Sequence, residues 1–131
     1  MNDAQQSGHV PTKGLYGWIT HTELISTDPG ATKSWCQSVL GWVFQPGFST
    51  PAGEYHLFAY SEKGGGGIRQ TNPSETPGSL PCVHVADANA SFEKALLEGA
   101  EEVMKPVRVM EGVTVAVVRA PGGVPIGFSG P

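Results

Sequence analysis

The stretch "GWITHTELISTDPGATKSWCQSVLGW", residues 17–42, combines a predicted strand with a predicted helix and decides the fold. Its first part, residues 16–26, is rich in β-branched and aromatic side chains, which favour a pleated strand. Alternation along that strand places His21 and Glu23 on the same face. The His-x-Glu pair raises the question of whether this strand contributes to a metal-dependent active site.

The second part of the stretch has the signals of a short helix. Thr27 or Asp28 can cap its N-terminus, Pro29 suits its first position, and Gly41 suits the left-handed residue that ends it. Side chains four residues apart should face the core. The predicted buried stripe consists of Ala31, Trp35 and Val39.

The remaining sequence repeats this pattern. Three short strands are expected at residues 42–45, 54–60 and 66–70. After the linker-like residues 71–81, a strand to Ala86, an Asp87 cap, a helix ended by Gly99 and two strands around a Pro-Gly-Gly turn follow. Shifting one half by about 60 residues superposes it on the other.

This duplication predicts an α+β fold. It consists of two tandem βαβββ modules, residues 14–72 and 79–131, that form one curved, mixed, eight-stranded sheet with helices on its outer face. The length of 131 residues fits a single domain, here residues 14–131, after a flexible polar tail of residues 1–13. A ligand would bind on the concave face.

Composition narrows the class of partner. The net charge of −4 and the lack of a Lys/Arg cluster argue against nucleic-acid binding. No apolar run is long enough for a membrane span. Cys36 and Cys82 lack metal-type spacing, so we expect free thiols and a cytoplasmic location.

The duplicated unit resembles the vicinal oxygen chelate superfamily, which includes glyoxalase I, bleomycin-resistance proteins and extradiol dioxygenases. The likeness rests on "HTELISTDPGATKSWCQSVLGW", "VHVADANASFEKALLEGAEEV" and "VTVAVVRAPGGVPIGF". The resemblance implies metal ligands on the first and last strands of each module. Those four positions fall on His21, Arg69, Pro81 and Gly127, of which only His21 is a metal ligand; a one-residue slip would replace Pro81 with Cys82.

The predicted cleft holds His21, Glu23 and Arg69 as its polar groups. Strand alternation allows two alternative sets of neighbours. One set is His56, Phe58 and Tyr60, and the other is Tyr55, Leu57 and Ala59. We favour the first set because the small aliphatic pair of the second suits packing under a helix.

These residues support a metal-independent protein, without cofactor, that binds a small, partly apolar or oxyanionic organic molecule. Arg69 would hold an oxyanion, with His21 as donor or base, or would pair internally with Glu23; a ligand could also displace that pair. Catalytic residues and enzymatic activity are left open. The alternative is a metal-dependent lyase, isomerase or dioxygenase with His21, Glu23 and His56 as ligands. The resemblance also implies a homodimer.

Overall fold

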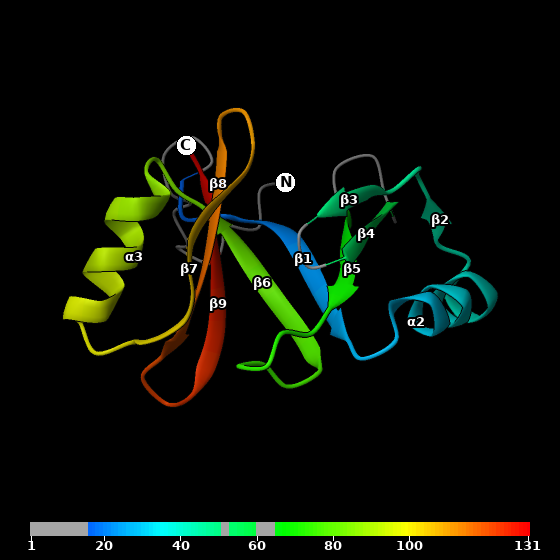
Figure 1. Ribbon diagram of the computed structural model, residues 1–131, viewed down its shortest axis with the longest axis horizontal. Coiled ribbons are helices and arrows are strands. Elements are labelled where there is room, and N and C mark those ends of the chain that lie inside the picture. The colour runs from blue at the N-terminus through cyan, green and yellow to red at the C-terminus, as the bar shows by residue number, and fades with distance from the viewer. Residues whose placement is uncertain (1–15, 51–52, 60–64) are drawn as a thin grey trace, which may run out of the picture.

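The computed structural model describes residues 16–50, 53–59 and 65–131 (Figure 1). The predicted flexible tail, residues 1–13, lies outside these ranges. The first half contains β1 (Ile19–Ser26), α2 (Pro29–Trp35), the π-helix η1 (Cys36–Leu40), β2 (Val43–Phe44), β3 (Phe48–Thr50), β4 (Gly53–Ala59) and β5 (Gly65–Gln70). The second half contains β6 (Gly78–His84), α3 (Ala88–Leu97), β7 (Glu101–Met110), β8 (Val113–Ala120) and β9 (Val124–Gly130). Within the described ranges no helix is long and apolar enough to cross a bilayer.

One mixed sheet runs through both halves. Its strand order is β2-β4-β5-β1-β6-β9-β8-β7, and the short β3 pairs with β4 beside this path. The first strands of the two halves, β1 and β6, are antiparallel neighbours at the centre. Each of them pairs in parallel with the last strand of its own half, β5 and β9. The duplicated architecture predicted from the sequence is confirmed, with β3 as an additional strand.

The predicted caps hold both helices in place. The Asp28 side chain accepts a hydrogen bond from the Ala31 amide at 3.1 Å, and Asp87 accepts one from the Ala90 amide at 3.0 Å. Gly41 takes a left-handed conformation, with φ of 69°, and ends η1. Side-chain and backbone caps of this kind satisfy amide and carbonyl groups that have no partner within the helix.

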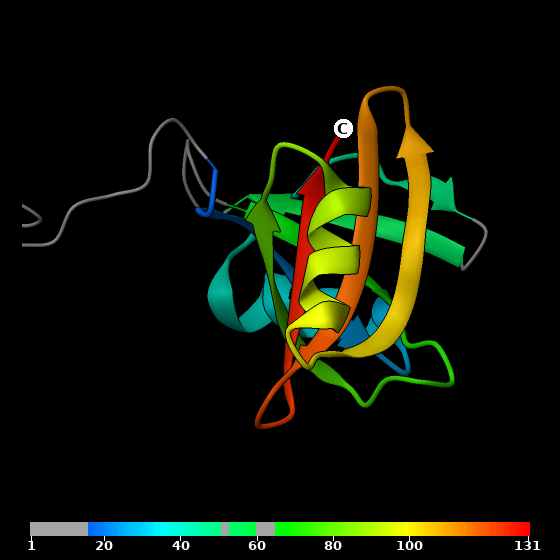
Figure 2. The same cartoon turned by 90° about the vertical axis from the view of Figure 1, so that its left-hand side faces the viewer.

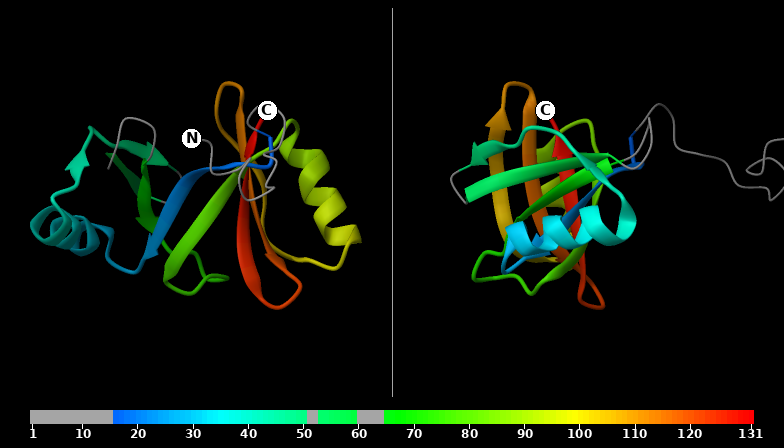
Figure 3. Two further views of the ribbon diagram at one scale, coloured as in Figure 1. Left: turned by 180° about the vertical axis from the view of Figure 1, so that it is seen from behind. Right: turned by 90° about the vertical axis from the view of Figure 1, so that its right-hand side faces the viewer.

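The helices lie on the outer face of the sheet at opposite ends (Figures 1 and 3). Helix α3 packs on β7, β8 and β9 (Figure 2), where Phe92 meets Ala116 and Val118. Helix α2 and η1 pack near β1 and β5, where Cys36, Phe58 and Ile68 form a second cluster. A third apolar cluster lies on the opposite, concave face and consists of Ile25, Leu80, Cys82 and Val117. The sheet is therefore packed on its outer face under each helix and on its concave face between them.

The predicted buried stripe of the first helix is wrong. Ala31 is exposed, and so are Trp35, at 57%, and Val39, at 58%, whereas Cys36 is buried. Ala31 and Trp35 lie in the regular α-helix before the π-segment, and their side faces solvent; the side one residue further on, with half-buried Thr32 and buried Cys36, faces the sheet. The predicted stripe was therefore placed one residue too early along the helix.

Candidate functional site

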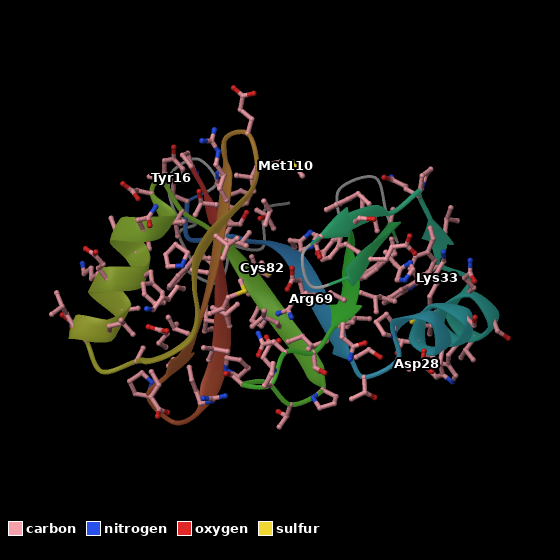
Figure 4. The ribbon with its side chains drawn as sticks, in the orientation of Figure 1. Tyr16, Asp28, Lys33, Arg69, Cys82 and Met110 are labelled. Carbon is pink, nitrogen blue, oxygen red and sulfur yellow. The ribbon has the colours of Figure 1, made fainter. Side chains whose placement is uncertain are left out.

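A hydrogen-bonded group of polar side chains lies on the concave face at the centre of the first half. His21 and Glu23 come from β1, as strand alternation predicted, and Arg69 comes from β5. The parallel register of β1 and β5 pairs Ile25 with Arg69, so both point to this face. Figure 4 shows Arg69 and Cys82 among the central strands, between the two helices. We call His21, Glu23, Tyr55, Arg69 and Glu75 the polar network.

Arg69 is the centre of the polar network. Its Nε donates to Glu23 Oε1 at 2.7 Å, and its Nη1 and Nη2 donate to the two carboxylate oxygens of Glu75, both at 2.7 Å. The three side chains are only 14%, 15% and 4% exposed, respectively. The internal Glu23 pair, one of the two roles considered for Arg69, is therefore present, together with a second carboxylate.

Glu75 was not predicted as a site residue. It lies in the connection between β5 and β6, which has the composition of a linker. Its backbone and side chain are fixed by a turn in which the Asn72 amide donates to Glu75 Oε1 at 3.2 Å. The only sequence signal was a single carboxylate six residues after Arg69, and that spacing alone does not predict a contact.

Tyr55 links Glu23 to His21. Its hydroxyl donates to Glu23 Oε2 at 3.1 Å and lies 2.5 Å from His21 Nε2. Because the hydroxyl has one hydrogen, which goes to Glu23, the neutral His21 must carry its proton on Nε2 and donate to the Tyr55 oxygen. Every buried side-chain nitrogen and oxygen in the described ranges has a hydrogen-bond partner. The polar network is thus closed on itself.

Burial and charge set the protonation states. Burial lowers the pKa of His21, although the Glu23 charge acts in the opposite direction. Burial, followed by Glu23, raises the pKa of Tyr55. Burial alone would lower the pKa of Arg69 and raise that of Glu75, but their hydrogen bonds outweigh it, so the Arg69 pKa is raised and the Glu75 pKa is lowered. At neutral pH, His21 and Tyr55 are uncharged, while Arg69 and Glu75 are charged.

The predicted orientation of β4 is wrong. Phe58 packs with Cys36 and Ile68 on the helix side, and His56 shares that face by alternation, with Nδ1 3.7 Å from the Glu54 carboxylate. Tyr60 lies outside the described residues. The other set, which begins with Tyr55, lies on the concave face, where Tyr55 belongs to the polar network.

The physical reason is a glycine in the neighbouring strand. A Cβ at Gly67 would lie 2.1 Å from carbon atoms of the Tyr55 ring, so the missing side chain makes the space that the ring fills. The Tyr55 ring can therefore lie on the concave face, although the small aliphatic residues of its set led us to expect that set under a helix. The glycine run at residues 64–67 was the available sequence signal.

The register of β6 differs by one residue from the prediction. His21 pairs with Cys82, and Thr22 pairs with Pro81, so Cys82 lies on the concave face and Pro81 does not. Gly127 pairs with Cys82 and keeps its predicted position on that face. Burial, assisted by the Glu23 charge, raises the pKa of Cys82 to about 12, which keeps it a thiol at neutral pH.

The side chains at the superfamily's metal positions do not fit a metal ion. With the corrected register these positions hold His21, Arg69, Cys82 and Gly127. The guanidinium would repel a cation, and its two carboxylate partners are already engaged. In the described part of the chain, no three His, Cys, Asp or Glu residues are placed to hold a metal.

The alternative metal set of His21, Glu23 and His56 does not converge either. His21 and Glu23 point to the concave face of the sheet, whereas His56 shares the opposite face with Phe58. A single ion cannot reach all three through the sheet.

A pocket of about 110 Å³ lies beside the polar network on the concave face. Its floor is apolar and includes Ile25, Val103 and Val117. The connection from Glu75 to Ser79 forms one wall, and the β8–β9 hairpin, with Arg119, forms the other. Arg119 and this pocket were not predicted from the sequence, because they depend on how the two halves meet.

Comparison with known proteins supports the fold. No protein-family model matches the chain, and no curated protein matches it significantly by sequence. Among solved structures, methylmalonyl-CoA epimerase from Mycobacterium tuberculosis is similar, with 16% identity, a TM-score of 0.67 and 95% of each chain covered. A glyoxalase/bleomycin resistance protein/dioxygenase superfamily member from Vibrio splendidus 12B01 has 14% identity, a TM-score of 0.58, and 83% of this chain and 95% of that chain covered.

Another methylmalonyl-CoA epimerase, from Streptomyces coelicolor and in complex with 2-nitronate-propionyl-CoA, has 14% identity and a TM-score of 0.59 over 88% of this chain and 97% of that chain. These similarities define a protein with the glyoxalase-like fold of the vicinal oxygen chelate superfamily. The resemblance found in the sequence is thereby confirmed for the fold. At such identities the similarity does not extend to the reaction or the ligand.

Proposed function

We propose that this protein binds a small, partly apolar organic molecule on the concave face of its sheet, without a bound metal ion. The support is the combination of two adjoining features on one face. The polar network contains a fixed cation where superfamily enzymes would need metal ligands. The adjoining pocket has an apolar floor and a polar rim, which is the usual composition of a small-molecule site.

The single observation that carries metal independence is the position of Arg69 between two carboxylates. A divalent ion would have to displace the guanidinium from both Glu23 and Glu75. Without the guanidinium, both carboxylates would lose their partner in a largely buried place. The guanidinium thus supplies the positive charge that a metal would supply, but offers no open coordination position.

Metal analysis of the full chain, purified without chelators, tests this part. We expect clearly less than one equivalent of Zn²⁺, Mn²⁺, Fe²⁺ or Ni²⁺ per chain, and no change in metal content for His21→Ala. One equivalent of metal in the wild-type protein, lost in His21→Ala, would establish the metal-dependent alternative instead.

Ligand binding is tested with a screen of small organic acids, amides, esters and ketones by thermal shift, followed by NMR. We expect at least one compound to raise the melting temperature and to shift amide resonances near Ile25 and Val117, which line the pocket. Compounds that shift only resonances of the outer face, or a screen without any binder, would contradict the proposal.

A further inference from the structure

The pocket beside the polar network contains a second arginine whose charge is not matched by a carboxylate. Arg119, on β8, lines the pocket, and its Nη2 donates to the Ser74 carbonyl oxygen over a long 3.4 Å. Glu101, on β7, is the cross-strand partner of Arg119. Within the described residues, however, no carboxylate forms an ion pair with Arg119. Most of the donors of this guanidinium are therefore available to a ligand.

Arg69, by contrast, is not available as an anion site. Its Nε and both Nη atoms already donate to carboxylates, and Nη1 also lies 3.3 Å from the Gln70 carbonyl oxygen. The cluster of Arg69, Glu23 and Glu75 carries a net charge of −1, from one cation and two anions, so it disfavours a further anion. Arg69 instead fixes Glu75, and with it the wall of the pocket.

The size and lining of the pocket limit the ligand. At about 110 Å³ it is well below the roughly 300 Å³ at which drug-sized sites begin. Its floor offers the apolar side chains of Ile25, Val103 and Val117. Glu75 also lines the pocket, but both of its oxygens face the Arg69 guanidinium. The site thus suits a short apolar chain whose charged end lies next to Arg119.

We propose that this pocket binds a short-chain carboxylate, with the carboxylate on the Arg119 guanidinium and the alkyl chain on Ile25, Val103 and Val117. A charge-assisted, two-point hydrogen bond from arginine favours a carboxylate over a neutral amide of the same shape. This inference rests on the proposed function and deepens it, because it replaces Arg69 with Arg119 as the residue that selects an anion.

The test is an NMR titration of the full-length protein with butanoate and with butanamide, its neutral counterpart. We expect butanoate to shift the amides of Ser79, Val117 and Gly123, which line the pocket, and to bind about tenfold or more tightly than butanamide. Arg119→Gln should remove this preference. Arg108→Gln, which removes the same charge from an exposed position on β7, is the matched control and should leave it intact.

Arg119→Lys serves as a second variant if Arg119→Gln does not fold; it keeps the charge without the planar fork and should bind butanoate more weakly than wild type does. Equal binding of butanoate and butanamide, or unchanged butanoate binding in Arg119→Gln, would overturn this inference while the proposed function stands. Absence of binding by both probes would also overturn the assignment of a carboxylate to Arg119. The broader ligand screen described above would then test the proposed function independently.

Discussion

The guanidinium of Arg69 is the one group on which the polar network depends. It neutralises two carboxylates that are largely shielded from water. Its ion pairs link β5 to Glu23 on β1 and to Glu75 in the segment between β5 and β6. A buried ion pair adds little to the stability of a fold in comparison with apolar residues that replace all of its members. Removal of one member alone, however, leaves an uncompensated buried charge and is strongly destabilising. The role of Arg69 is therefore tested by removing it alone.

Arg69→Met should lower the free energy of unfolding by about 3–5 kcal/mol, because Glu23 and Glu75 would lose their shared partner. Urea denaturation followed by circular dichroism measures this change. Arg108→Met, at an exposed site on β7, should stay within about 0.5 kcal/mol of wild type. Adding Glu75→Gln to Arg69→Met should recover part of the loss; no recovery would show that the carboxylates are solvated without Arg69.

Among the residues of the network, strand periodicity was sufficient for His21 and Glu23, which are two positions apart on one strand. Arg69 was placed with them because the resemblance puts it at the ligand position on the last strand of the first module. Glu75 could not be placed, since its position follows from a turn around Asn72 and not from a periodic element. Tyr55 was one of two possible choices, and its own strand gives no sign of which face is concave.

Strand β5 determines which face of β4 turns to the concave side. Its glycines allow close approach of neighbouring groups, and the absence of a side chain at Gly67 leaves space for the Tyr55 ring. A single glycine can thus set the orientation of an aromatic residue on the neighbouring strand, which no pattern within β4 could indicate. The same kind of limit applies to the first helix, where helical spacing alone did not indicate which side faces the sheet.

Gly67→Ala should destabilise the protein by about 1–3 kcal/mol, because the new methyl group would meet the Tyr55 ring. Thermal and urea unfolding measure the loss. Gly30→Ala, in α2, meets only Asp28 Oδ1 at 3.7 Å and should be neutral or slightly stabilising. In a Tyr55→Ala background the cost of Gly67→Ala should largely disappear, and an equal cost in both backgrounds would contradict this packing.

The arrangement of the whole molecule follows from the repeat. In the sequence, a strand followed by a capped helix and a terminating glycine occurs twice, which predicts two equivalent halves. In the structure, the parallel pairing of first and last strand also occurs in both halves, as β1 with β5 and as β6 with β9. The register between the halves is a different matter. His21 pairs with Cys82, the residue that a one-residue slip from Pro81 brings there, and no side-chain pattern of β6 decides between the two registers.

Acid should destabilise the whole molecule in two stages. The pKa of His21 is lowered in the fold, so the unfolded chain binds more protons below its ordinary value of 6.5, and stability falls as the pH drops below that value. The pKa of Glu75 is also lowered, so its contribution is present above its ordinary value of 4.5 and is lost as the pH falls through the folded value.

Urea unfolding from pH 8 to pH 3 should show both stages as a decrease in the free energy of unfolding. His21→Gln should remove the stage below about pH 6.5, and Glu75→Gln should remove the stage below about pH 4.5, since neither replacement titrates in this range. His84→Gln, at a histidine that stacks on Tyr16 away from the polar network, is the control for the first stage. A wild-type protein that becomes more stable between pH 7 and pH 5 would contradict the assignment of a neutral His21 donating to Tyr55.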